Sequence, residues 1–279
     1  MNAEKLLNKY AVGERNFSNV QIGEINLANQ DLSRADFRHA DLRKANLKGA
    51  KLIGANFREA VLIGANLAET NLTLANLIGA NLTDANLQSS RLTEAGMRSV
   101  NLARANLSQA NLRETILNEA NFDTANLREA NLHEASLSRA RMVGVDLTGA
   151  ILENANLSST LLNGAILKDA TLVGVLLNSS MMEGADLRDV DLSRAKLSGC
   201  NLVNANLSGA NLRSANLSWS SLRGANLTGA TLYRAKLHWS NLSGANLTEA
   251  VLINAKLDYA NLRNTNLAGA ILPDGLTYD

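Results

Sequence analysis

Residues 45–64 read ANLKG-AKLIG-ANFRE-AVLIG, and the five-residue pattern of this stretch continues in one register along most of the chain. From Phe17 to Leu272 a large apolar residue stands at every fifth position, which gives 52 consecutive units, and Leu occupies 44 of these central positions. The residue two places earlier is Ala in 35 units, and the residue between them is Asn or Asp in 31. A period that persists without insertion or deletion predicts a repeat fold.

A five-residue period fits neither a regular helix nor a flat strand. On a helix, successive leucines would spread around the axis, and on a strand an odd step sends alternate leucines to opposite faces. The Ala and Leu positions all stay inside only if the chain bends at every unit. Four bends close a square coil of twenty residues, so the 52 units predict about thirteen stacked coils. The other three positions of each unit then face solvent.

Residues twenty apart form columns along such a stack. Phe17, Phe37 and Phe57 share one column, which predicts stacked rings. The column of Asn26 and Asn46 holds Asn or Asp in almost every coil, and stacked amides can hydrogen-bond to one another. Of the 19 glycines, 15 occupy the last position of a unit, mostly in two of the four columns. We therefore expect a positive φ at these glycines and turns that differ between the sides of the coil.

Units such as Ala45-Asn46-Leu47-Lys48-Gly49 and Ala245-Asn246-Leu247-Thr248-Glu249 resemble the pentapeptide-repeat family. The resemblance covers nearly the whole chain and implies an all-β fold, a right-handed quadrilateral β-helix. The opening residues 6–17 and the closing residues 270–275 are similar to cyanobacterial members, which include a regulator of heterocyst differentiation. This similarity implies a regulatory protein that works by binding another protein.

The sequence before the repeat predicts a helix. Within residues 1–14 the apolar side chains follow helical spacing, and Gly13 suits the position just past a helix end. We expect this short N-terminal helix to cap the open end of the coils. Arg15 and Gln30 stand where other units have a small residue, so the first coil is expected to be irregular.

The repeat itself predicts one uninterrupted domain over residues 15–272, followed by a C-terminal cap over 273–279. Residues 273–275 read Pro-Asp-Gly, which is a turn signal. After this turn, Leu276 and Tyr278 are expected to cover the apolar interior of the last coil.

Composition argues against catalysis and against a cofactor or metal. The 27 basic and 26 acidic residues give a net charge of +1, and the one cysteine excludes an internal disulfide. His39, His133 and His238 are about five coils apart, more than roughly 20 Å at strand spacing, so they cannot share a metal ion or a proton. No stretch reads as a signal peptide or as a membrane span, which predicts a cytoplasmic protein without a membrane partner.

One surface stands out near the C-terminus. Residues 192–248 contain no acidic residue but six basic ones. Column arithmetic places two exposed tryptophans and a tyrosine on one side of the coils, with lysines in a second column of that side and a histidine between them. Aromatic rings flanked by cations are typical of binding surfaces. The predicted partner-binding residues are Lys196, Trp219, Lys236, His238, Trp239, Lys256 and Tyr259.

Other interpretations remain open. The aromatic rings could simply stack and stabilise the C-terminal coils. A girdle of apolar residues between Leu161 and Met181 could instead seat a partner. For function we favour a non-enzymatic protein-interaction module, regulatory or scaffolding, over two alternatives. A DNA-mimicking topoisomerase or gyrase binder requires a strongly acidic surface, which the net charge of +1 does not supply. Nucleic-acid binding through the basic and aromatic residues is the second alternative, and six dispersed cations are a weak footprint for it. The chain is expected to be a monomer or an end-to-end dimer.

Overall fold

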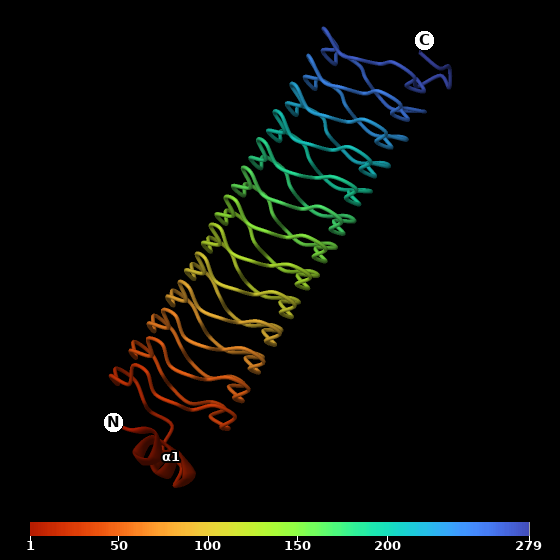
Figure 1. The fold of residues 1–279 in the computed structure, drawn as a ribbon. Helices are drawn as coiled ribbons and strands as arrows, with labels where there is room; N and C mark the ends of the chain where they lie inside the picture. Colours follow the sequence, from red (N-terminus) through yellow and green to blue (C-terminus); the bar gives the residue numbers. More distant parts are fainter. Residues whose placement is uncertain (279) are drawn as a thin grey trace. The chain divides into compact units, whose positions relative to one another are not determined.

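The structure is a computed structural model that describes residues 1–278. The chain divides into two compact units, Met1–Arg141 and Met142–Asp279. Each of these two compact units is a repeat solenoid of the β-helix type, in which the chain winds through successive coils (Figure 1). Within the described residues, no helix has the length and apolar character needed to cross a membrane.

Helix α1 spans Ala3–Ala11 in the first unit, where the apolar spacing predicts a helix. The side chain of Asn2 caps its start by accepting a hydrogen bond from the N–H of Lys5 at 2.9 Å. Gly13 follows the helix with a φ of +99°, as expected for a residue just past a helix end. Leu6 is fully buried, and the Tyr10 hydroxyl donates to the carbonyl of Ser33 at 2.9 Å. The helix therefore packs on the first coil.

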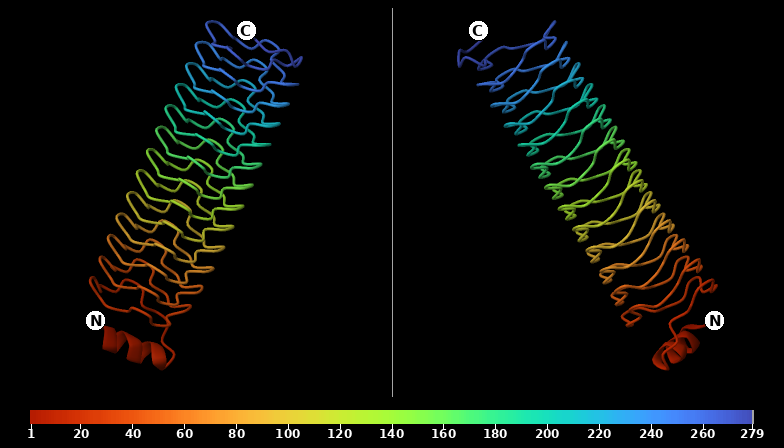
Figure 2. Two further views of the ribbon diagram at one scale, coloured as in Figure 1. Left: turned by 45° about the vertical axis from the view of Figure 1, so that its right-hand side comes forward. Right: turned by 180° about the vertical axis from the view of Figure 1, so that it is seen from behind.

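Within each compact unit, single β-bridges hold each coil to the next, and residues 1–278 contain no strand longer than such a bridge. The residue before a central position pairs in parallel with the residue twenty places on, as in Asn26↔Asn46 and Asn206↔Asn226. The central residue donates its N–H to the next coil, as Leu27 does to Asn46 at 2.7 Å. Four such bridges recur in every twenty residues within each unit, so each coil has four sides (Figure 2). We number the sides by their first central residues, which are residues 17, 22, 27 and 32 for the first to the fourth side.

The turns between sides share one conformation. In the unit centred on Leu32, the N–H of Ala35 bonds to the Leu32 carbonyl at 3.1 Å, and Arg34 has a φ of +61°. In a type II turn only the third of the four residues has a positive φ. The last position of every five-residue repeat from Asn19 to Gly269 has such a positive φ, and these 51 positions are 36 non-glycine residues and 15 glycines. The expectation that turns differ between sides is therefore wrong in this respect.

The first coil follows the same rule. Asn19, Glu24, Asn29 and Arg34 all have φ values near +60°. The predicted irregularity of this coil is wrong, because long side chains at the small positions can point away from the axis while the backbone keeps its turns. Gln30, for example, is partly exposed and donates a side-chain hydrogen bond to the carbonyl of Ala28 at 3.3 Å.

The central and small positions form the core of each unit. Central residues from position 17 to position 252 are at most 3 % exposed. The rings of Phe17, Phe37 and Phe57 stack with centroid separations of 5.6 and 5.2 Å, which confirms the predicted aromatic column. The predicted column of hydrogen-bonded amides is also confirmed, because the side-chain amide of Asn46 donates to the amide oxygen of Asn26 at 2.9 Å. Each such amide oxygen also accepts from the backbone two residues on, which explains the preference for Asn or Asp at this position.

The C-terminal residues turn back and pair with the fourth side of the last coil. Thr277 forms an antiparallel bridge with Ile271, and Tyr278 exchanges backbone hydrogen bonds with Gly269 and Ala270 at 2.9 and 2.8 Å. The predicted turn at residues 273–275 is present, with Gly275 at a φ of +88°. This tail closes one of the four sides through its backbone.

The predicted apolar cover over the last coil is wrong. Leu276 is 66 % exposed and Tyr278 is 48 % exposed, so these side chains do not seal the interior. The central residues Leu257, Leu262 and Leu267 remain partly exposed. Residues 273–278 form the turn and the pairing with the fourth side, so none of them covers these leucines.

Candidate functional site

The three predicted aromatic residues form a continuous external stack on the first side of the second unit. The rings of Trp219 and Trp239 are 5.2 Å apart with an interplanar angle of 5°, and those of Trp239 and Tyr259 are 4.2 Å apart at 14°. The three side chains are 66 %, 50 % and 74 % exposed, respectively. This aromatic ladder therefore presents its ring edges and one open end to solvent.

The backbone beneath the aromatic ladder has the conformation of the other turns. Trp219, Trp239 and Tyr259 have φ values of +64°, +58° and +60°, and Gly199 occupies the same column one coil earlier. A non-glycine residue in the left-handed region costs about 1–2 kcal/mol, but other turn residues such as Arg234 bear the same cost. The two stacked pairs contribute about 1–3 kcal/mol at 0.5–1.5 kcal/mol each. The aromatic ladder is therefore distinguished by its exposed ring surface and not by its backbone.

A lysine column lies along the other end of the same side. Lys196 and Lys236 each form a parallel bridge with Asn216, and Lys236 pairs in turn with Lys256. All three lysines are exposed. Among the described residues, no carboxylate lies within salt-bridge distance of their ammonium groups. The column is therefore a row of available positive charge beside the aromatic ladder.

His238 lies between the two columns and has a partner that the sequence did not reveal. Its Nδ1 is 2.9 Å from a carboxylate oxygen of Asp258, and both side chains are more than a third exposed. The two residues are twenty apart, so the column rule could have found this pair. His238 therefore belongs to the surface as part of a pair with Asp258. We name the seven predicted residues the aromatic-basic face, and the structure brings them together on one side.

A second cluster on the fourth side was missed by the sequence analysis. The guanidinium carbon of Arg213 lies 4.5 Å from the ring centre of Tyr233, and that of Arg234 lies 5.0 Å from it. No carboxylate of residues 1–278 forms an ion pair with either arginine. Because Arg234 precedes Lys236 across one corner, the cluster extends the positive surface around that corner. Arg213 and Tyr233 are twenty residues apart, so the column rule would have predicted this contact.

The apolar girdle is less coherent as a site. Ile166 and Met181 are 40 % and 38 % exposed, whereas Leu161 and Leu176 are only partly exposed. Leu161 pairs with Met181 on the second side, while Ile166 pairs with Asp186 on the third side. The structure thus brings only one pair of these residues together.

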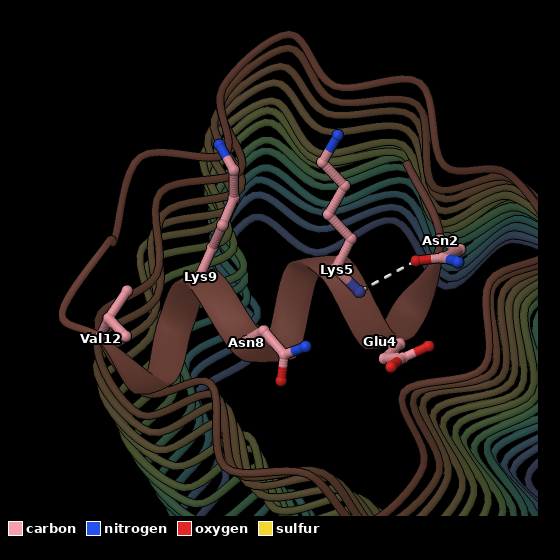
Figure 3. A pocket seen from close by; sticks show the side chains of 6 residues that line it. All are labelled: Asn2, Glu4, Lys5, Asn8, Lys9 and Val12. Atoms are coloured by element: carbon pink, nitrogen blue, oxygen red, sulfur yellow. Dashed lines mark hydrogen bonds between the residues drawn. The ribbon is translucent and has the colours of Figure 1, made fainter.

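The first unit has a shallow hollow beside its helix. One depression of about 610 Å³ lies against α1 and is lined by exposed side chains (Figure 3), namely Asn2, Glu4, Lys5, Asn8, Lys9 and Val12. It is far from the aromatic-basic face along the sequence, and none of its lining side chains is buried. Residues 1–278 contain no group of three His, Cys, Asp or Glu side chains that could hold a metal ion. Burial raises the pKa of the Cys200 thiol to about 12, so this cysteine is not a nucleophile at neutral pH.

Comparisons with known proteins agree with the repeat geometry. The family model "Pentapeptide repeats (8 copies)" matches overlapping segments that run without a gap from residues 21–58 to residues 245–274. No curated protein matches the chain. Among solved structures, HetL from the cyanobacterium Nostoc sp. strain PCC 7120, a pentapeptide-repeat protein involved in heterocyst differentiation regulation, is 34 % identical. The match covers 100 % of both chains, with a TM-score of 0.36.

Two further solved structures are similar over shorter stretches. A pentapeptide-repeat protein of the Arabidopsis thaliana thylakoid lumen is 32 % identical over 39 % of this chain and 70 % of its own, with a TM-score of 0.29. QnrB1, a plasmid-mediated fluoroquinolone resistance protein, is 20 % identical over 63 % and 88 %, with a TM-score of 0.38. The family match over nearly the whole length, together with the 34 % identity to HetL, shows that this chain belongs to the pentapeptide-repeat family.

Proposed function

We propose that the chain is a non-enzymatic, cytoplasmic protein-interaction module with a regulatory or scaffolding role. It binds a partner protein through the aromatic-basic face. The observation that carries this proposal is the aromatic ladder, whose three stacked rings are 50–74 % exposed beside the lysine column. Trp and Tyr are among the residue types most enriched in the hot spots of protein interfaces.

The first experiment removes the rings. In the variant Trp219→Ser/Trp239→Ser, the core is untouched but two stacked ring pairs worth about 1–3 kcal/mol are lost. We therefore expect a folded protein with a modestly lower melting temperature, and loss of partner capture from a lysate of the source cells. The matched control is Ile166→Ser/Met181→Ser, which removes two exposed apolar side chains of the same unit. Capture that survives the tryptophan change but not the control change would transfer the binding site to the girdle.

Nucleic-acid binding is the second candidate function, favoured by the arginine pair on Tyr233 next to the lysine column. It predicts binding to a single-stranded oligonucleotide that weakens steeply as salt is raised, because cations that neutralise phosphates release counterions. Arg213→Ala would reduce that binding. DNA mimicry towards a topoisomerase receives no support from the near-neutral charge.

We also propose that residues 15–272 act as one uninterrupted domain, because the repeat keeps its register through positions 141 and 142. A single cooperative unfolding transition, with calorimetric and van't Hoff enthalpies in agreement, is the expected result. Two resolved transitions would show that the two compact units fold separately.

A further inference from the structure

The two ends of the repeat are finished differently. In the first coil the central residues at positions 17, 22, 27 and 32 are at most 3 % exposed, and α1 packs against that coil. In the last coil Leu257, Leu262 and Leu267 are all partly exposed. Among the described residues, 276–278 pair with the fourth side of the last coil and none pairs with its other three sides. Within residues 1–278, three sides thus end in an unpaired β edge.

The unpaired groups of this edge follow from the hydrogen-bond pattern of the earlier coils. In the preceding coil, Leu237 donates to the Lys256 carbonyl at 2.7 Å and Trp239 donates to the Asp258 carbonyl at 3.1 Å. The equivalent N–H groups, those of Leu257 and Tyr259, find no acceptor among residues 1–278. The carbonyl of Ala255 likewise finds no donor there. We name residues 255–259, with these groups, the terminal edge.

We propose that an extended segment of the partner protein, carrying an acidic residue, adds to the terminal edge as a further coil side. This inference rests on the proposed function, since the terminal edge is the end of the aromatic-basic face, and it names the kind of segment that binds. Addition of a strand to an exposed edge supplies affinity through main-chain bonds and specificity through alternate side chains.

The chemistry of the segment can be read from the terminal edge. In parallel register its second residue lies beside Lys256, which has no acidic partner among the described residues, so a carboxylate fits there. The third residue points inward over the partly exposed Leu257 and must be apolar. The fifth residue continues the column of Tyr259, whose ring stacks on Trp239 and is 74 % exposed, so a planar side chain fits there.

A second copy of this chain fits the open end poorly. Within residues 1–278, the three open sides present five unpaired N–H groups, from Leu257, Tyr259, Leu262, Asn264 and Leu267. By the same pattern they present three unpaired carbonyls, one at each small position. If two such ends met, surplus donors would face surplus donors. An extended segment in parallel register instead offers two carbonyls and one N–H to a side, as each coil does to the preceding one, and so matches the groups of the terminal edge.

The test uses the full chain and the synthetic peptide acetyl-Ala-Glu-Leu-Ser-Tyr-amide, which carries the required pattern. Its control is the same peptide with an N-methyl group on the Glu backbone nitrogen, because that change removes the donor to Ala255 and keeps every side chain. We expect N-methylation to weaken binding about tenfold, measured by fluorescence anisotropy. The variant Lys256→Glu should weaken the unmodified peptide about three- to tenfold, whereas Lys196→Glu, three coils away, should not.

Hydrogen exchange gives an independent reading at the terminal edge. Peptide binding should slow exchange of the Leu257 and Tyr259 amides. Equal affinity of the two peptides, no protection of these amides, or no binding at millimolar peptide would each overturn edge addition. The proposed function would then still be tested by partner capture with the Trp219→Ser/Trp239→Ser variant. Protection that rises with protein concentration in the absence of peptide would also overturn it, in favour of a second copy.

Discussion

Phe37 offers a direct test of how much the aromatic column contributes to stability. Its ring is fully buried and stacks on Phe17 at 5.6 Å and on Phe57 at 5.2 Å. Replacing Phe37 with Leu puts the commonest central residue in its place but removes two ring pairs, which are worth about 0.5–1.5 kcal/mol each beyond burial. We therefore expect a loss of about 1–3 kcal/mol, in addition to a volume change that costs less than about 1.5 kcal/mol.

The matched control is Phe122→Leu. Phe122 is equally buried but has no stacked ring among the described residues, so only the volume change applies. Phe37→Leu should lower the free energy of unfolding by about 2 kcal/mol more than Phe122→Leu, which corresponds to roughly 4–8 °C in melting temperature. Urea unfolding followed by circular dichroism measures both. Equal losses in the two variants would refute the view that stacking along a column contributes beyond burial.

Three further outcomes follow from the core and the ion pairs. Ala125→Leu overpacks a corner that is 1 % exposed and should cost about 2–3 kcal/mol. Asn126→Ala loses the hydrogen bond to Asn106 and the one from the Arg128 N–H, and should cost about 1–2 kcal/mol; a larger loss of melting temperature for Asn126→Ala than for Ala125→Leu would contradict the assignment of inside and outside. Cys200 should react with a thiol reagent at pH 8 only after denaturation, because burial holds its pKa at about 12; fast labelling of the native protein would contradict its burial. The hydrogen bonds that Arg38 donates to Asp36 lower the pKa of that carboxyl below 3.8, so the stability it contributes is present above pH 4 and is lost as the pH falls through the lowered value. Asp36→Asn should flatten that part of the stability profile in urea titrations between about pH 2 and pH 5.

Much of the fold could be predicted because one rule, pairing at a spacing of twenty, relates sequence to space. The rule placed Phe37 between its two neighbours, aligned the amides of Asn26 and Asn46, and brought Trp219 under Trp239. It would also have found the pair of His238 and Asp258 and the arginines on Tyr233, had it been applied to every charged residue.

Other features could not be read from the columns. The clustering of glycine suggested that sides differ in their turns, yet residues such as Glu24 and Arg34 adopt the same positive φ at an energetic cost. The Pro-Asp-Gly turn was predictable, but the sequence did not indicate that the residues after it would pair with the fourth side. Leu276 is therefore exposed where an apolar cover was expected, and the open terminal edge became visible only in the structure.

The pairing of each residue with the one twenty places on constrains how such a chain can change its length. Duplication of one five-residue unit would leave every buried position correctly filled, yet it would move all later columns by one side relative to the earlier ones. Trp239 would then no longer follow Trp219 in its column if the insertion fell between them. Duplication of twenty residues preserves each column and adds a complete layer. Whole-coil duplications can therefore lengthen the protein while its surfaces stay aligned, whereas the duplication of a single five-residue repeat rearranges those surfaces even though every buried position stays apolar.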